Sequence, residues 1–329
     1  MDAFVTGAAG FIGSNLVDAL LARGDNVTGY DNFSTGQQAF LAAATMNARF
    51  RLIEGDLLDT DKLTNAMGRA DVVFHLAANA DVRFGLQHPR KDLEQNTLAT
   101  FNVLEAMRAN AVKVLSFAST AVVYGEPLTI PTPEDAPFPI QTSLYGASKA
   151  ACEGLITAYT EGYGLRGQIF RFVSVLGERY THGHVFDFVK HLLSDPSALQ
   201  VLGDGMQRKS YLYVADCVEG MLTALDRVDT KLSVFNLGTD EYCRVSDSVA
   251  WITARLGVAP RLNYSGGSRG WIGDNSFVWL DTGRIRSHGW RARLGIREAI
   301  ERTVDWLVEN QWVFQDRAGL GVASDRGRE

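Results

Sequence analysis

Residues 3–13 of the chain read AFVTGAAGFIG, in which an apolar run leads directly into three glycines. Apolar residues then recur at positions 16, 17, 20 and 21 with helical spacing. A strand, a glycine turn and a helix in this order are typical of a dinucleotide-binding unit, although such a turn also occurs without a ligand. Gly7 would allow the tight turn, Gly10 would let the backbone approach a pyrophosphate, and Gly13 would let the helix pack on the strand.

The residues around this turn predict which dinucleotide is bound. The N–H groups at the start of the helix, around Phe11 and Ile12, would face the phosphates. A second predicted strand, residues 26–30, leads to Asp31, eighteen residues after the last glycine of the turn. A carboxylate there can accept hydrogen bonds from the ribose hydroxyls and would repel a 2′-phosphate, so the sequence favours NAD over NADP. We expect Asn32 to contact the cofactor beside it.

A second motif, SLYGASK at residues 143–149, places Tyr145 and Lys149 four residues apart. On a helix this spacing puts both side chains on one face. A phenol, with a pKa of about 10, is a poor base at neutral pH. A nearby ammonium and the positive ring of an oxidised nicotinamide would lower that pKa, so the pair suits proton transfer from a hydroxyl. Because such pairs also arise by chance, the prediction depends on the dinucleotide unit.

Composition excludes several classes of function. The chain has 329 residues, of which 46% are hydrophobic and 21% charged, enough for a sizeable core in one large domain or two. A formal net charge of −6 argues against nucleic acid as the partner, and no apolar run approaches the ~18 residues that cross a membrane. Three cysteines without metal-ligand spacing predict thiols in a reducing cytoplasm and no metal site.

The first half of the chain alternates predicted strands with predicted helices. This rhythm predicts an α/β fold, a Rossmann-like doubly wound parallel sheet with helices on both faces. We assign residues 1–175 to this core, 176–315 mainly to a smaller substrate-binding lobe that could return to the core, and 316–329 to a flexible tail. Ligands bind beyond the carboxyl ends of such strands. The residues that follow predicted strands are Gly7, Asp31, Asp56, Ala77, Ser119 and Ser174.

With these pieces in place, the chain resembles the extended short-chain dehydrogenase/reductase family, most closely its nucleotide-sugar 4-epimerase branch. The motifs that carry the resemblance are TGAAGFIG (6–13), GDL (55–57), HLAA (75–78), STAVVYG (119–125), SLYGASK (143–149) and GDG (203–205) before YV (213–214). The resemblance implies a tightly held NAD, a nucleotide-diphosphate sugar as substrate, and a homodimer formed through the helices that start near Asn96 and Gly146.

The resemblance also implies roles for individual residues. Tyr145 would take the proton of the sugar's C4 hydroxyl, and Lys149 would bind the nicotinamide ribose and lower the Tyr145 pKa. Thr120 would hydrogen-bond the reacting oxygen, with Ser119 able to share that role; the alternative for Thr120 is a strand-end hydroxyl that satisfies backbone. For His75, inside an apolar strand, we expect a core histidine. The further cofactor contacts implied are Asp56, Leu57, Ala77, Ala78 and Asn96.

The substrate contacts depart from the family pattern. Ser174 stands where the family commonly has an asparagine, and Lys209, preceded by Arg208, stands where it has an arginine. Lysine keeps the charge but loses bidentate geometry. Arg269 resembles the family's second diphosphate-binding arginine. Solvated surface charge is the alternative for Arg208 and Lys209.

The residues after Thr120 bear on the reaction. Related dehydratases and decarboxylases carry an acidic residue directly after the Ser/Thr, whereas Ala121 and Val122 stand here and can move no proton. Elimination is therefore disfavoured. The leading hypothesis is 4-epimerisation through a transient 4-keto sugar, and the second is a sugar-nucleotide 4-ketoreductase. A non-catalytic dinucleotide sensor is the remote alternative, against which the intact Thr120, Tyr145 and Lys149 count.

Overall fold

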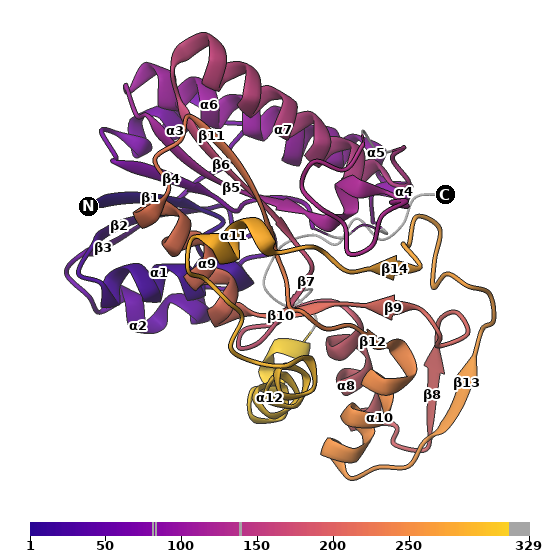
Figure 1. Ribbon diagram of the computed structural model, residues 1–329. Coiled ribbons are helices and arrows are strands. Elements are labelled where there is room, and N and C mark those ends of the chain that lie inside the picture. Colours follow the sequence, from indigo (N-terminus) through magenta and orange to yellow (C-terminus); the bar gives the residue numbers. More distant parts are fainter. Residues whose placement is uncertain (81, 83, 138–139, 316–329) are drawn as a thin grey trace.

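The computed structural model describes residues 1–80, 82, 84–137 and 140–315. Its centre is a seven-stranded sheet in the order β11-β6-β5-β4-β1-β2-β3, and every neighbouring pair is parallel (Figure 1). The predicted Rossmann-like α/β fold is confirmed. In chain order the strands are β1 (Asp2–Thr6), β2 (Asn26–Asp31), β3 (Phe50–Glu54), β4 (Val72–His75), β5 (Val114–Thr120), β6 (Arg166–Phe172) and β11 (Leu232–Leu237).

Helices cover both faces of this sheet (Figure 1). One layer contains α3 (Thr60–Met67), α6 (Ala99–Ala109) and α7 (Leu144–Tyr163). The other contains α1 (Phe11–Ala22), α2 (Ala42–Thr45), α9 (Val214–Arg227) and α11 (Gly283–Ser287). Because the strands between these layers are buried on both faces, they read as continuous apolar runs rather than as alternating ones. In β1, for example, Ala3, Phe4 and Val5 are all fully buried.

The lobe that follows β6 is built from short strand pairs and three helices. Its strands are β7 (Ser174–Leu176), β8 (Ala198–Val201), β9 (Arg208–Lys209), β10 (Tyr211–Tyr213), β12 (Cys243–Arg244), β13 (Arg261–Tyr264) and β14 (Phe277–Val278). Its helices are α8 (His184–Ser194), α10 (Val245–Leu256) and α12 (Ile296–Glu309). One face of α12 is apolar and is buried against α8 and α10; it consists of Ile296, Ile300, Val304 and Leu307.

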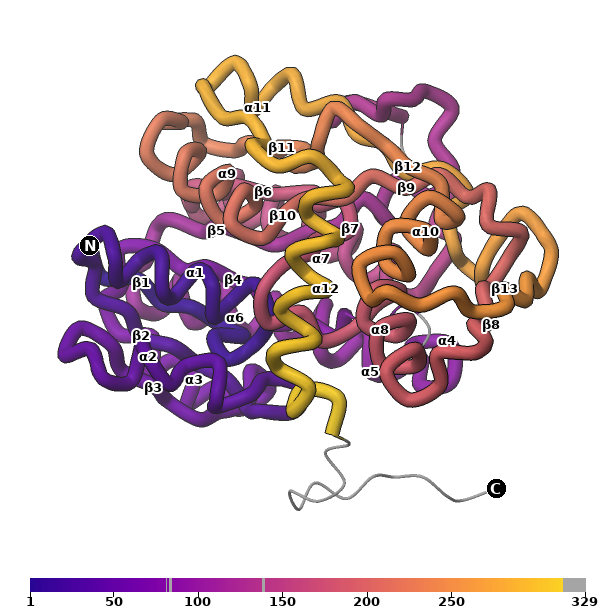
Figure 2. Tube along the Cα trace, turned by 90° about the horizontal axis from the view of Figure 1, so that it is seen from below, coloured from indigo at the N-terminus to yellow at the C-terminus, as the bar shows by residue number. Residues whose placement is uncertain are grey.

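Two of the connections between the lobe and the core come from β11 and from the end of α12. The chain returns to the central sheet through β11, which pairs with β6, so the sequence after residue 175 contributes to both parts. The end of α12 packs on the core, where the rings of Trp306 and Trp312 lie 6.2 and 5.7 Å from that of Phe40 (Figure 2). The domain boundary near residue 175 stays a prediction.

Shorter elements complete the described chain. They are η1 (Gln38–Leu41), α4 (Phe84–Gln87), α5 (Pro89–Asp92), the π-helix η2 (Leu93–Leu98), η3 (Ala121–Tyr124) and η4 (Gln311–Phe314). No helix among the described residues has the length and apolar character needed to span a bilayer. Cys152, Cys217 and Cys243 are free and buried. The predicted tail, residues 316–329, lies outside the described residues.

Candidate functional site

The glycine turn after β1 has the geometry that a dinucleotide cradle requires. Gly7 has a φ of +68°, and a Cβ there would lie 2.8 Å from the Ala77 nitrogen. A Cβ on Gly13 would lie 2.0 Å from the Gly7 oxygen, so only glycine lets α1 approach the turn. Gly10 caps α1 without a side-chain hydrogen bond. The first-turn N–H groups, including those of Phe11 and Ile12, therefore point out of the helix toward the space a phosphate would fill.

The predicted adenosine contacts gather beside this turn. Asp31 ends β2, and its two carboxylate oxygens accept the N–H groups of Ala9 (2.9 Å) and Phe33 (2.8 Å). These bonds fix the carboxylate against the glycine turn, at the place where a ribose hydroxyl would donate to it. Asn32 donates to Asp56 Oδ2 at 2.9 Å, which joins the ends of β2 and β3. The residues present thus fit an NAD whose adenosine lies over these two strands.

The residues predicted to contact the nicotinamide half of the cofactor come from the end of β4 and from the helix η2, which packs on α7. Ala77 and Ala78 follow β4, and Thr6 Oγ1 accepts the N–H of Ala77 at 3.3 Å. Asn96 is buried in the π-helix η2 and donates to Ser148 Oγ at 2.9 Å. Ser148 belongs to the turn of α7 between Tyr145 and Lys149, so Asn96 supports the helix that carries this pair. Leu57, on the adenosine side, is buried beneath Asp56.

Tyr145 lies in the first turn of α7, where Ser143 caps the helix by accepting the N–H of Gly146 at 3.0 Å. Burial raises the pKa of the Tyr145 phenol, and a hydrogen bond with the Thr120 side chain partly offsets this. The hydroxyl of Thr120 also accepts the N–H of Val122 at 3.2 Å. Both interpretations of Thr120 therefore apply: it satisfies backbone at a strand end, and it meets Tyr145.

Lys149 lies on the same face of α7 as Tyr145, and its ammonium bonds to β5. Its Nζ donates to the Ala118 oxygen at 2.8 Å and lies 4.6 Å from the centre of the Phe117 ring. Burial lowers the pKa of this lysine. His75, as predicted, is a satisfied core histidine: Nδ1 bonds Thr6 Oγ1 (2.8 Å) and Nε2 bonds Thr100 Oγ1 (3.0 Å). Burial lowers its pKa to about 3, so it is neutral.

Ser119 does not lie with Thr120. Its hydroxyl donates to Glu153 Oε1, eight residues beyond Tyr145 on α7. Glu153 lies eight residues, or about 12 Å along the helix axis, beyond Tyr145, so this bond holds the Ser119 hydroxyl away from the phenol. The structure therefore brings Thr120, and not Ser119, to Tyr145.

The small sheet of the lobe, formed by β12, β9 and β14, separates two of the predicted substrate cations, Lys209 and Arg208. Lys209 forms a buried ion pair with Asp274 Oδ1 at 2.6 Å and also donates to the Asn275 oxygen. Arg208, the preceding residue of β9, points to the other side, where its guanidinium lies 3.7 Å from the centre of the Phe277 ring. Arg208 is exposed there, as expected for a solvated surface charge.

The loop around Asp274 faces the start of α7. Asn275 donates to the Gly125 oxygen, and Thr142 Oγ1 donates to Asn275 Oδ1 at 3.3 Å. Lys209 therefore lies on the side of the lobe that faces Tyr145. Arg269, at the start of this loop, is half exposed and pairs with Glu126 at 3.1 Å. Ser174 is exposed at the start of β7, directly beyond β6.

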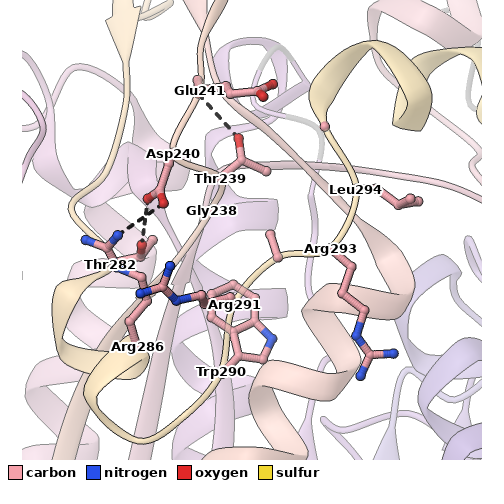
Figure 3. A pocket seen from close by; sticks show the side chains of 12 residues that line it. Gly238, Thr239, Asp240, Glu241, Thr282, Arg286, Trp290, Arg291, Arg293 and Leu294 are labelled. Atoms are coloured by element: carbon pink, nitrogen blue, oxygen red, sulfur yellow. Dashed lines mark hydrogen bonds and ion pairs between the residues drawn. The ribbon is translucent and has the colours of Figure 1, made fainter.

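A cavity elsewhere in the lobe contains none of the predicted residues. Figure 3 shows it between the loop after β11 and the loop before α12, where Asp240 pairs with Arg286 and both face Thr282. Glu241 accepts the first N–H of α12 there, from Ile296. Among the described residues no cluster of three potential metal ligands occurs.

Several residues that act on the site could not be singled out from the sequence. Glu153 binds Ser119 and Arg171, Asp92 raises the pKa of Tyr145, and Glu126 holds Arg269. A signal was present for Glu153, since it falls four residues after Lys149 and next to the buried Cys152 and Ile156. The contacts of Asp92 and Glu126 depend on segments far apart in the sequence.

Comparison with known proteins agrees with this geometry. The model of the "NAD dependent epimerase/dehydratase family" matches residues 3–238. A UDP-glucose 4-epimerase of Mycolicibacterium smegmatis is 32% identical over 315 residues, 93% of this chain and 98% of that protein. The crystal structure of a UDP-galactose 4-epimerase is 36% identical with a TM-score of 0.85, covering 95% of this chain and 100% of the other.

A second solved structure contains a nicotinamide cofactor. It is a UDP-glucuronic acid 4-epimerase from Bacillus cereus in complex with UDP-glucuronic acid and NAD, 28% identical with a TM-score of 0.86 over 94% of this chain and 99% of that one. The resemblance stated from the motifs and the predicted cofactor, NAD, are confirmed. The chain belongs to the NAD dependent epimerase/dehydratase family.

Proposed function

We propose that this protein is a 4-epimerase of a nucleotide-diphosphate sugar that works through a transient 4-keto sugar. The observation that carries the proposal is the position of the Tyr145 phenol beside the Thr120 side chain at the carboxyl end of β5. This pair lies in the same crevice as the glycine cradle, because the carboxyl ends of parallel strands share one edge of the sheet. Ala121 and Val122 supply no acid for elimination, which supports epimerisation over dehydration.

The proton chemistry falls to side chains of this chain. NAD, when bound, supplies the acceptor and then the donor of the C4 hydride. Thr120 would hold the C4 oxygen while Tyr145 Oη takes the hydroxyl proton, and Tyr145 would return the proton to the opposite epimer. Burial raises the Tyr145 pKa and keeps the resting phenol protonated. A positive charge beside the phenol is therefore needed to lower that pKa, and we assign part of it to Lys149.

The substrate is proposed to enter between the lobe and the start of α7. Arg269 is the available cation there, since its exposed pair with Glu126 is easily exchanged for a diphosphate. Lys209 is committed to Asp274, so it would act on the substrate through the loop of residues 269–276. Relatives act on UDP-linked glucose, galactose or glucuronic acid, and we propose a UDP-sugar here.

We also propose a homodimer formed through α6 and α7. The outer face of these helices exposes Leu98, Phe101 and Tyr163, with exposed fractions of 44, 40 and 51%. Aromatic contacts continue across both helices, from Phe101 to Tyr159 and from Tyr159 to Tyr163. The free thiols support a reducing compartment, the cytoplasm, as the place of action.

The test is turnover of a panel of nucleotide sugars without added cofactor. UDP-glucose, UDP-galactose, UDP-glucuronic acid and UDP-N-acetylglucosamine are incubated with the purified full chain, and the products are separated by chromatography. The expected result is the 4-epimer of at least one of them. A product that forms only with added reduced nicotinamide would replace the proposal with a 4-ketoreductase.

A further inference from the structure

Glu153 is a buried carboxylate that the proposed reaction does not use. It lies in the middle of α7 with an exposed fraction of 8%. Oε1 accepts Arg171 Nε at 3.1 Å and Oε2 accepts Arg171 Nη2 at 2.7 Å, a bidentate pair, and Oε1 also accepts the Ser119 hydroxyl. Ser119 and Arg171 are register neighbours in β5 and β6. Glu153 thus joins α7 to β5 and β6, two neighbouring strands of the sheet.

The bonds between α7 and the end of β5 form an ordered set. Three consecutive residues of β5 each bond a different residue of one face of α7, in which Tyr145, Lys149 and Glu153 follow each other at intervals of four. The Ala118 oxygen accepts Lys149 Nζ, Ser119 binds Glu153, and Thr120 binds Tyr145. A shift of the helix along the strand would break all three bonds together.

We propose that Glu153 is a positioning residue for the proton transfer proposed above: through Ser119 and Arg171 it fixes the α7 face that carries Tyr145 and Lys149 against the end of β5. Glu153 does not reach the reacting atoms itself. Its role rests on the proposed function, because what it positions is the Tyr145 hydroxyl beside Thr120. When a catalytic group is displaced by about 1 Å, the rate can fall by a factor of about 100.

The side chain of Arg171 is anchored on more than Glu153. Its Nη1 donates to the Glu134 oxygen at 3.1 Å, and its guanidinium lies 4.6 Å from the centre of the Tyr124 ring. Tyr124 OH in turn donates to Asn236 Oδ1 at 2.8 Å, and Asn236 is the register neighbour of Arg171 in β11. Since Arg171 is held from three other elements, Glu153 binds a fixed point.

The same carboxylate acts on the charge of Lys149. Burial lowers the pKa of Lys149, and the negative charge of Glu153 opposes that shift. The other titratable groups around Lys149 are Tyr145 and Cys152 on α7 and His75 on β4, which is neutral. Loss of the Glu153 charge should therefore lower the Lys149 pKa, so that the lysine becomes neutral at a lower pH.

The test compares Glu153→Gln with Glu161→Gln, the same substitution at an exposed position of the same helix. The Lys149 pKa is measured by NMR titration of the protein carrying ¹³Cε-lysine, with Lys149→Met to assign the signal. We expect Glu153→Gln to lower this pKa and Glu161→Gln to leave it unchanged. The titration needs no substrate, so it tests the effect of Glu153 on Lys149 even if the wild type epimerises none of the sugars. A wild type without epimerase activity would refute only the proposed function.

Turnover then separates positioning from simple stabilisation. We expect Glu153→Gln to lower kcat by roughly 10- to 100-fold, with KM changed by less than about threefold and the alkaline limb of the kcat profile moved to lower pH. A double variant, Glu153→Met with Arg171→Met, replaces the ion pair by apolar chains and preserves folding. Its kcat should stay low. An unchanged Lys149 pKa in folded Glu153→Gln, or a double variant within twofold of wild-type kcat, would overturn the proposal.

Discussion

The phenol of Tyr145, in the first turn of α7, lies beside the side chain of Thr120, the last residue of β5, and this contact lowers the pKa of the phenol. Both residues are almost completely buried. Burial raises the pKa of the phenol, so Tyr145 is held as a neutral donor beside a second hydroxyl. A substrate hydroxyl that enters between them would meet one group able to hold its oxygen and, once a positive charge lowers the pKa of the phenol, one group able to take its proton.

Replacement of Tyr145 tests this relationship directly. Tyr145→Phe keeps the ring that packs in the first turn of α7 and removes only the hydroxyl. We expect turnover to fall by at least ~100-fold, the scale of a lost general base, while the melting temperature changes by only a few degrees. Tyr163→Phe, at the exposed end of the same helix, is the matched control and should retain wild-type turnover. Near wild-type activity of Tyr145→Phe would refute the mechanism.

The cofactor preference depends on Asp31. Asp31→Asn keeps the size of the side chain but removes its negative charge, and it leaves one of the two N–H groups, of Ala9 or Phe33, facing an NH2 instead of an oxygen. We expect NAD to bind about 10- to 100-fold more weakly, because hydrogen bonds to a charged acceptor are lost, and the preference for NAD over NADP to shrink. Calorimetric titration of the cofactor-free protein with both dinucleotides measures this. Asp61→Asn, an exposed change in α3, serves as the control. Equal affinity of the wild type for NADP would contradict the assignment.

The local motifs were predictable because their geometry is encoded by neighbouring residues. The turn of residues 7–13 requires glycine where a Cβ would meet backbone, and this requirement is visible in the sequence. The alternation of strands and helices likewise predicts a parallel sheet. Within this alternation, β5 begins at Val114 and not at the apolar Val112. Val112 instead closes the turn after α6, donating to the Met107 oxygen.

Contacts between distant segments could not be predicted in the same way. Lys209 looks like an available cation, but Asp274, sixty-five residues later, neutralises it. Ser119 and Thr120 are adjacent hydroxyls, and only the fold shows which of them meets Tyr145. The return of β11 to the core follows a series of short elements whose pattern does not indicate which sheet they join. Tertiary pairing, and not local preference, decides each of these cases.

Two buried histidines predict loss of stability in acid. Burial lowers the pKa of His75 to about 3 and that of His184 to about 4, whereas the unfolded chain has a histidine pKa of about 6.5. Below pH 6.5 the unfolded state therefore binds more protons than the folded state, and the free energy of unfolding falls as pH falls. From pH 7 to pH 5 each histidine should cost about 2 kcal/mol.

Urea denaturation at several pH values checks this expectation. His184→Gln should remove about 2 kcal/mol of the loss between pH 7 and pH 5, because glutamine does not titrate and can still bond Ser248. His191→Gln, at an exposed position of α8, should leave the pH dependence as it is. A wild type equally stable at pH 7 and pH 5 would show that these histidines are not held neutral.

The two arginines near the lobe's small sheet should behave differently. Arg269 faces the start of α7 and pairs only with the exposed Glu126 among the contacts the structure describes, whereas Arg208 stacks on Phe277 on the other side of β9. We expect Arg269→Gln to raise KM for the nucleotide sugar about tenfold, the scale of one lost charged hydrogen bond. Arg208→Gln is the matched control and should change KM by less than twofold. Steady-state kinetics on both variants decides, and a larger effect at Arg208 would move the substrate to the opposite face.

The exposed aromatic face of α6 and α7 predicts a dimer that one substitution separates. Phe101 lies in the middle of this face, with its ring 6.3 Å from that of Tyr159. Phe101→Glu would place an unpaired charge in the centre of the interface, where a hot-spot loss of about 2 kcal/mol or more weakens association at least about 30-fold. Light scattering at micromolar concentration should report a dimer for the wild type and a monomer for the variant. Met46→Glu, an exposed change after α2 on the opposite layer, should remain dimeric. A monomeric wild type would contradict the proposed assembly, and a dimeric Phe101→Glu would place the interface on another face, because the charge would then remain in solvent at no cost to association.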